Sequence, residues 1–250
     1  MSRNCIVPLV AGVLSAALLS AQTAAELVAR NTEAKGGLAR IKAIRTLRMT
    51  GKLQSGSFVV RIRTDAMRPE FLRQTSTIQG MSAIEAYDGS SGWRISPFEG
   101  RKDPELLGED DLKPLVESAD FYGPLVDYQE KGNRIEYLGH DTVDGDDAYR
   151  LKVTLHNGDI IYYYLDPDTY LEIRTEKQVF VRGAVRESFM EYGSYKKVAG
   201  VYYPYSIEMG SQENPGARSK LAFDTIEANV PMGESEFRMP AAGAAGKAGK

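Results

Sequence analysis

The chain has 250 residues, a formal net charge of −3, one cysteine and two histidines. Because it is slightly acidic and contains no run of basic residues, we do not expect it to bind nucleic acid. The two histidines are too few for a histidine-rich zinc centre, and we expect neither a metal nor another cofactor.

Residues 1–25 have the features of a secretory signal peptide. One positive charge precedes an apolar stretch over residues 6–19, and small residues follow it. Cleavage is predicted after Ala21 or after Ala25, and the second position fits better because Thr23 then lies three residues upstream of the cut. A membrane anchor is the alternative, but the apolar stretch is shorter than the roughly 20 residues that a spanning helix needs.

Cys5 is the only cysteine and lies within the predicted signal peptide. The mature chain would therefore have no disulfide, no thiolate nucleophile and no cysteine metal site. It would also have no cysteine at the cleavage point for attachment of a lipid. We expect a soluble exported protein, and the periplasm fits best.

The mature domain is expected over residues 26–240. Removal of the signal peptide leaves about 225 residues, which is enough for one large β domain. The last ten residues, 241–250, are only alanine, glycine and lysine, so we expect a disordered tail.

The periodicity of the mature chain is first helical and then extended. Residues 26–43 have apolar positions at helical spacing, and the pair Gly36-Gly37 is expected to kink or split this helix. From Ile44 onward apolar and polar residues alternate, as is typical of strands. The turn signals Asn157-Gly158 and Asp166-Pro167-Asp168 separate later strands. About eleven short strands are predicted, which is a barrel or sandwich pattern.

Only residues 103–127 interrupt the strands with a helical pattern. Four of their apolar residues have the spacing of one helix face: Leu112, Leu115, Val116 and Ala119. The acidic run 109–111 suits the first turn of a helix. Glycines and prolines within the segment indicate hinged pieces, so we expect an interrupted helical pair that covers an apolar surface.

A curved sheet with this many strands encloses more space than its own side chains fill, which predicts a ligand cavity. Large apolar residues expected to point inward include Ile62, Leu72 and Tyr87. Such a cavity would bind an apolar ligand if it were closed from water. The segment 103–127 is the candidate cover.

Enzyme motifs are missing from the sequence. It contains neither a Gly-x-Ser-x-Gly elbow nor a His-Glu-x-x-His helix. The aspartates between residues 141 and 147 do not have the spacing of an EF-hand loop. We therefore do not expect an enzyme. The only tryptophan, Trp93, is expected either in the core or in the wall of the cavity.

Two local motifs resemble the LolA family of periplasmic lipoprotein carriers. Arg68-Pro69 lies between two predicted strands, like the arginine-proline pair of that family. The stretch 87–98, which reads YDGSSGWRISPF, resembles the family's Asp-Gly, aromatic and Pro-Phe stretch. The helical segment 103–127 then follows where the family has its lid. The order of elements matches over residues 26–240.

The resemblance implies a mainly β (α+β) fold, an open antiparallel half-barrel with an N-terminal helix and an inserted helical lid. In this family the arginine of the pair holds the lid closed through hydrogen bonds, and acyl chains displace the lid. Arg68 is therefore the candidate latch. The other residues expected to form the cavity and its lid, besides Ile62, Leu72 and Tyr87, are Trp93, Phe98, Leu106, Leu107, Leu115, Val116, Phe121 and Leu125.

The expected function is that of a carrier for lipid or for the acyl chains of lipoproteins on their way to the outer membrane. Transfer of a ~16-carbon chain out of water gains on the order of 12 kcal/mol, so acylated cargo needs a shielded route. An inner-membrane exporter and an outer-membrane receptor are the implied partners, and we expect a monomer. The alternative is an envelope-stress sensor or another regulatory lipid-binding module of the same fold.

Overall fold

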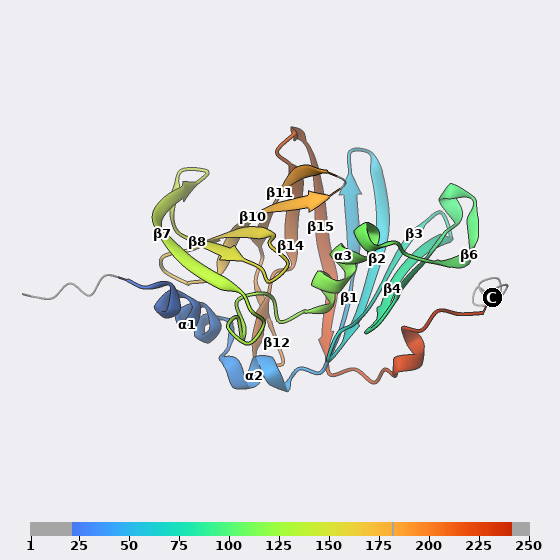
Figure 1. Cartoon of the computed structure of the whole chain (residues 1–250), viewed down its shortest axis with the longest axis horizontal. Helices are drawn as coiled ribbons and strands as arrows, with labels where there is room; N and C mark the ends of the chain where they lie inside the picture. The colour runs from blue at the N-terminus through green and yellow to red at the C-terminus, as the bar shows by residue number, and fades with distance from the viewer. Residues whose placement is uncertain (1–21, 182, 242–250) are drawn as a thin grey trace, which may run out of the picture.

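One large antiparallel sheet organises the chain and curves around a helix (Figure 1). The structure is a computed structural model that describes residues 22–181 and 183–241. The expected signal peptide up to residue 21 and the tail from residue 242 lie outside the described residues.

The large sheet has thirteen strands in the order β6-β5-β4-β3-β2-β1-β15-β14-β11-β10-β9-β8-β7. Its strands are β1 (Thr46–Ser55), β2 (Phe58–Met67), β3 (Phe71–Ile78), β4 (Met81–Asp88), β5 (Gly92–Ser96), β6 (Arg101–Leu106), β7 (Arg134–Val143), β8 (Asp146–Thr154), β9 (Ile160–Leu165), β10 (Glu172–Val181), β11 (Ala184–Gly193), β14 (Ser206–Ser211) and β15 (Asn214–Ala228). A separate hairpin pairs β12 (Lys196–Val198) with β13 (Val201–Tyr203). Because β6 and β7 stand at open edges, the predicted mainly β, open half-barrel fold is confirmed.

Strands β1 and β15, the first and the last along the sequence, pair with each other and join the two halves of the sheet. β1 pairs with β15 from Leu47 opposite Ala228 to Ser55 opposite Ser219. Strands β1 to β6 continue the sheet on one side, and β14 to β7 continue it on the other. The concave surface is therefore built from both ends of the sequence.

The segment 103–127 differs from its prediction as an interrupted helical pair. It contains one helix, α3 (Glu109–Ala119), while its first residues belong to the edge strand β6. The main chain of β6 hydrogen-bonds to β5, and this pairing overrides the local sequence pattern. Residues 121–132 after α3 form turns rather than a second helix. The additional edge strand is one reason why the sheet exceeds the predicted eleven.

The N-terminal helix divides at the predicted glycine pair into α1 (Ala24–Lys35) and α2 (Leu38–Ala43). Gly36 and Gly37 have φ of 131° and 90°, which disfavour other residues. A Cβ atom on Gly36 would also lie 2.3 Å from the carbonyl oxygen of Gly200. Thr23 and Glu26 form a capping box at the start of α1. Of the two predicted cleavage points, only the one after residue 21 leaves this cap intact.

Helix α1 covers the β8–β9 end of the concave face. Leu27 and Val28 pack into an apolar cluster with Leu151 and Leu165 of these strands. Lys35 Nζ forms an ion pair of 2.9 Å with Glu172 Oε1 of β10. No helix among the described residues is long and apolar enough to cross a membrane.

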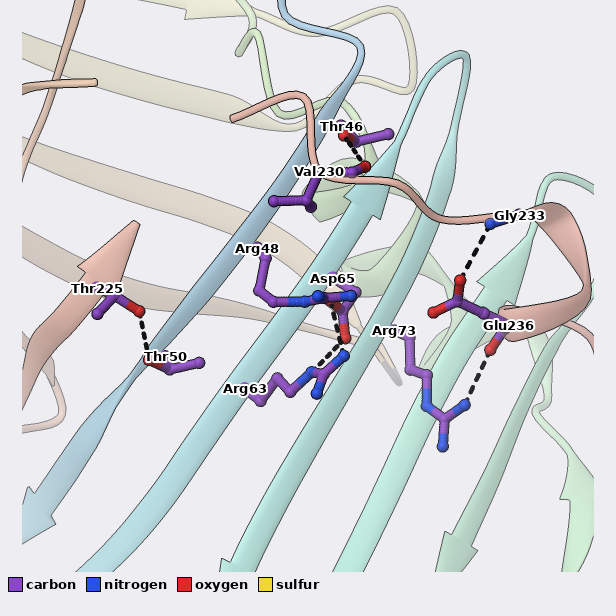
Figure 2. Close-up of polar contacts among 10 residues, drawn as sticks. All are labelled: Thr46, Arg48, Thr50, Arg63, Asp65, Arg73, Thr225, Val230, Gly233 and Glu236. Atoms are coloured by element: carbon purple, nitrogen blue, oxygen red, sulfur yellow. Dashed lines mark hydrogen bonds and ion pairs between the residues drawn. The ribbon is translucent and has the colours of Figure 1, made fainter. Parts of the chain in front are cut away.

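The outer face of the sheet is covered in part by the C-terminal strap, which we define as residues 229–241. The hydroxyl of Thr46 donates to the carbonyl oxygen of Val230 at 2.7 Å, and Arg73 Nη1 donates to that of Glu236 at 2.9 Å (Figure 2). Phe237 is fully buried, and its carbonyl oxygen accepts a 2.7 Å hydrogen bond from Trp93 Nε1. The strap therefore closes an apolar cluster on the outer face.

Removal of the Phe237 ring should destabilise the fold and expose the tryptophan. We expect Phe237→Ala to cost about 3–5 kcal/mol, the usual range for a buried phenylalanine, and to shift Trp93 emission to longer wavelength. Chemical denaturation and fluorescence measure both effects. Met239→Ala, which removes an exposed strap side chain, is the control and should change neither. An unshifted Trp93 spectrum in Phe237→Ala would contradict this packing.

The ion pair of Glu172 should make stability depend on pH. Burial by itself would raise the pKa of Glu172, but Lys35, together with hydrogen bonds from a backbone N–H and from Asn31, outweighs burial and leaves the pKa below its ordinary value of 4.5. The ionised carboxylate therefore stabilises the fold above pH 4.5, and this contribution is lost as the pH falls through the lower pKa of the folded state.

We expect Glu172→Gln to cost on the order of 3 kcal/mol at pH 7, because it leaves Lys35 without its buried partner. The variant should lose less stability than the wild type between pH 7 and pH 3, as measured by urea denaturation. Glu136→Gln, at an exposed position, should follow the wild-type pH dependence. Parallel pH curves for Glu172→Gln and wild type would refute the assignment.

Candidate functional site

Strand register defines the covered, concave face of the sheet. Ala66, Leu72 and Tyr87 stand directly opposite one another on β2, β3 and β4, and all three are buried in one cluster with residues of α3. Because side chains alternate between the faces of a strand, every second residue from these positions lies on the same face. This face is the candidate binding surface.

Helix α3 makes close apolar contact with β3 and β4. Leu115 and Ala119 are 4% and 0% exposed and form the buried side of the helix. A Cβ atom on Gly92 would lie only 2.5 Å from Cδ1 of Leu112, so the glycine allows the helix to approach β5. The helix thus rests on the β3–β5 side of the concave face.

Ion pairs hold the same helix to both halves of the sheet. Three pairs join it to strands or to the turn before β9: Asp111 Oδ2 to Arg94 Nη1 at 3.4 Å, Lys113 Nζ to Asp159 Oδ2 at 2.9 Å, and Glu117 Oε2 to Lys177 Nζ. Arg94 belongs to β5 and Lys177 to β10, which lie on opposite sides of the β1–β15 pairing. Helix α3 therefore bridges the concave face.

Arg68 lies at the C-terminal end of α3. Its Nη1 atom is 3.5 Å from Oδ1 of Asp120, and its guanidinium carbon lies 4.3 Å from the centre of the Tyr122 ring. Asp120 also forms an ion pair with Lys131, and the Tyr122 hydroxyl donates to the carbonyl oxygen of Ile44 at 2.8 Å. Arg68 thus contacts this segment through a hydrogen-bonded ion pair with a carboxylate and through the face of a ring. Its role as a latch stays a prediction.

The structure brings six predicted residues together at this helix. They form one cluster with Ala66 and Ala119: Leu72, Tyr87, Leu107, Leu115, Val116 and Phe121. Ile62 lies further along β2, half-buried, on the same face as Ala66. These residues form the contact between the helix and the concave face.

Four other predicted residues lie elsewhere. Trp93 is on the outer face, where it packs with Ala86 and Ile95 beneath the C-terminal strap. Leu125 belongs to the α1 cluster. Phe98 and Leu106 are 44% and 66% exposed, so neither is part of an enclosed wall. The placement of Trp93 follows from strand register, because it stands opposite Ala86 and therefore on the opposite face from Tyr87.

Beside α3, the concave face has an apolar wall that the helix leaves half-buried. Four side chains stand in one row across β2, β1, β15 and β14: Val60, Leu53, Leu221 and Ile207. Ile62 and Phe223 are both opposite Gly51 in the next row. All six of these side chains are neither fully buried nor fully exposed. We call these six residues the apolar wall.

A cleft of about 480 Å³ lies where α3 meets β3, β4 and β5, within the range of small-molecule sites. Its lining is mostly polar: Gln74, Glu85, Arg94, Asp110, Asp111, Pro114, Leu115, Ser118 and Arg186. Burial raises the pKa of Glu85 although Arg94 acts in the opposite direction. Among the described residues, no group of three or more histidines, cysteines or carboxylates is arranged to hold a metal ion.

Several polar groups of this region are withdrawn from water. Oε1 of Glu117 is buried, and no donor among residues 22–181 and 183–241 reaches it. The Tyr192 hydroxyl lies 2.9 Å from Oγ1 of Thr175, and burial raises the pKa of Tyr192 to about 12. Burial also raises the pKa of Tyr163 well above its ordinary value. These tyrosines are neutral hydrogen-bonding groups at physiological pH.

The sequence pattern does not predict the ion-pair partners of α3 at the candidate site. Lys113 and Asp159 are separated by 46 positions, and Glu117 and Lys177 by 60. No local pattern signals a pair at such a separation. Strand alternation does place Lys177 on the same face as Thr175, but it does not reveal which helix residue lies above.

Comparison with known proteins shows similarity at the level of fold. No protein-family profile matches the sequence, and no curated protein matches it significantly. A LolA superfamily protein from Nitrosomonas europaea superimposes with a TM-score of 0.58 at 13% identity, over 87% of this chain and 98% of the other. A DUF1329 family protein from Desulfovibrio piger gives 0.59 at 13% identity, over 86% and 97%.

A third structure of the same kind is a domain assigned as an outer membrane lipoprotein-sorting protein from Vibrio parahaemolyticus. It superimposes with a TM-score of 0.57 at 12% identity, over 85% of this chain and 95% of the other. The chain therefore has a LolA-like fold, as the local motifs indicated.

Loss of the Arg68 side chain should loosen α3. In Arg68→Leu we expect faster hydrogen exchange at amides 109–120, because the guanidinium no longer neutralises Asp120 or stacks on Tyr122. The expected change in protection is about 3- to 10-fold, in proportion to one partly exposed ion pair and one cation–π contact. Mass spectrometry of proteolytic fragments measures this exchange.

Arg63→Leu is the matched control, since Arg63 pairs with Asp65 on the outer face and does not contact α3. It should leave exchange in 109–120 unchanged. Equal exchange in Arg68→Leu and wild type would argue against Arg68 as a latch.

Proposed function

We propose that this protein binds the acyl chains of a lipid or lipoprotein on its concave face and carries them through the periplasm towards the outer membrane. The observation that supports this most is the apolar wall, which lies half-buried beside a helix that ion pairs hold in place. The LolA-like fold agrees with this function. The proposal includes no chemical reaction.

The ion pairs that hold α3 and the apolar contacts on the concave face together suit binding of an acyl chain followed by its release. The Asp111–Arg94 pair is partly exposed and contributes roughly 0–1 kcal/mol. The Asp159 carboxylate is buried beneath Lys113, but water would solvate both charges when α3 moves away, which limits the cost of displacing the helix. Burial of a methylene group gains about 0.8 kcal/mol, so an acyl chain of ~16 carbons that replaces the helix contacts gains on the order of 12 kcal/mol before ordering costs. Arg68 would hold the helix closed when no cargo is bound.

The cargo would be amphiphilic rather than wholly apolar. The unpaired oxygen of Glu117 and the hydroxyl groups of Tyr163 and Tyr192 can bond to an amide or hydroxyl group of the cargo. The polar cleft next to α3 offers further charged partners. The acyl chain would follow the apolar wall, and the cargo's polar part would remain near these groups.

We further propose that the protein acts as a monomer between an inner-membrane exporter and an outer-membrane receptor. Acylated cargo has to be loaded from one membrane and released at another, and each transfer requires a partner that favours the open position of α3.

Identification of the natural cargo tests the proposal directly. Protein purified from the periplasm of cells that express it should carry acyl-bearing molecules, which native mass spectrometry and lipid extraction would detect. If neither method finds such a ligand, and the protein also binds no apolar fluorescent probe, the carrier function is wrong.

A charge in the apolar wall should abolish this binding. We expect Ile62→Glu to reduce the affinity for an apolar fluorescent probe at least tenfold, because ligand binding would bury the carboxylate without a partner. Leu138→Glu, at an exposed position on β7, is the matched control and should bind the probe like the wild type. Circular dichroism would establish that both variants are folded. Equal probe affinity for Ile62→Glu and the control would place the ligand elsewhere.

A further inference from the structure

Six hairpins turn at the same end of the large sheet, and one of them, β8–β9, lies against α3 through the ion pair of Asp159 with Lys113. The other five form an exposed row. Antiparallel register places the β1–β2, β3–β4, β5–β6, β10–β11 and β14–β15 turns at this end. We call the five turns and the strand ends next to them the hairpin rim. In Figure 1 the β1–β2 hairpin projects away from α1 and α2, which lie at the opposite end of the strands.

Large apolar side chains are concentrated on the hairpin rim. Eleven such side chains are exposed among the described residues, and six of them are on the rim: Phe58, Val59, Met81, Phe98, Phe180 and Val185. Phe58 and Phe180 are 70% and 64% exposed, and Phe180 stands directly opposite Val185 in its hairpin. Exposure of this many large apolar groups at one end marks an interaction surface.

The same end of the molecule is basic. Among the described residues, the three central hairpin ranges 52–61, 178–187 and 211–220 contain five basic and two acidic residues, although the whole chain has a net charge of −3. Arg186, Arg218 and Lys220 form ion pairs with Glu213, Glu191 and Glu208, so Lys52 and Arg61 are the remaining cations of these ranges. The β3–β4 turn, residues 74–84, contains no charged residue. The rim therefore attracts anionic partners.

Two cations on the rim face each other without compensation. Lys52 of β1 is directly opposite Arg61 of β2, and both are exposed. Within the described ranges, no carboxylate lies at ion-pair distance from either side chain. Like charges in directly opposite positions destabilise a strand pair. An anionic partner would relieve this repulsion.

The rim also lies at the open end of the concave face. Helices α1 and α2 occupy the other end, whereas the polar cleft beside α3 includes Arg186 of the β10–β11 hairpin. A partner bound to the rim would therefore lie next to the cleft.

We propose that the hairpin rim docks on the surface of an anionic lipid bilayer. Phe58 and Phe180 enter the interface between head groups and acyl chains, while Lys52 and Arg61 contact lipid phosphates. The apolar groups stand on separate hairpin tips with basic residues beside them, which suits a bilayer interface. The core of a protein interface is typically depleted of charged residues and continuous. This docking does not depend on which cargo the concave face binds.

Vesicle binding tests the proposal with protein purified after export. Flotation would compare phosphatidylcholine vesicles with and without phosphatidylglycerol. We expect the wild type to bind only the vesicles that contain phosphatidylglycerol and to bind less as salt is added. The double variants Phe58→Ser/Phe180→Ser and Lys52→Gln/Arg61→Gln should each bind at least about tenfold more weakly.

The matched control is Leu38→Ser/Leu138→Ser, which removes two exposed apolar side chains away from the rim. It should bind vesicles like the wild type. All variants should retain apolar-probe binding, which separates loss of docking from damage to the concave face. Failure of the wild type to bind a probe would count against the carrier function but not against docking.

Four results would overturn the docking proposal. One is equal vesicle binding by the rim variants and the wild type, and another is an equal loss in the control. The third is binding that does not require phosphatidylglycerol. Absence of binding to any vesicle would also overturn it and would make a protein the partner of this rim.

Discussion

The pairing of β1 with β15 is the contact on which the rest of the structure depends. It joins the N-terminal and C-terminal halves of the sheet, which otherwise have no direct strand pairing. Only with this pairing do Leu53 and Leu221 become neighbours in the apolar wall. The ion pairs of α3 to β5 and β10 also require that both halves curve around the same space. Folding of the candidate binding surface therefore needs contacts between residues far apart in sequence, which are slow to form.

For the proposed function, the position of α3 is a compromise between cover and access. Its buried side is small, with Leu115 and Ala119 as the residues that are almost fully enclosed. Its other contacts include ion pairs. The Asp111–Arg94 pair lies near the surface and is weak and sensitive to salt, whereas the Asp159 partner of Lys113 is buried. A larger apolar contact would fill the concave face and prevent binding. A helix without ion pairs would leave the apolar wall exposed to water.

The sequence allowed the type of fold to be predicted better than the site. Alternation predicts strands because the period of two is local, and the split at Gly36-Gly37 is local as well. The local pattern of residues 103–106 predicts part of a helical pair rather than the edge strand β6, because the pairing of β6 with β5 is not visible in its own residues. Trp93 shows the same limit, since the face on which it lies depends on the strand register. Only the family resemblance points to Arg68, and its partners Asp120 and Tyr122 are defined by the structure.

An open sheet has two free edges, and these edges affect how copies of the protein meet. A free edge strand exposes unpaired backbone groups to which a strand of another copy can add. The edge strand β6 reads RKDPEL, so it carries four charged residues, and Pro104 has no N–H to offer a neighbour. At the other edge, alternate residues of β7 are exposed and include Arg134 and Glu136. Charge and proline thus oppose the growth of the sheet from one copy into the next, and the curved surface can remain open without becoming a site of aggregation.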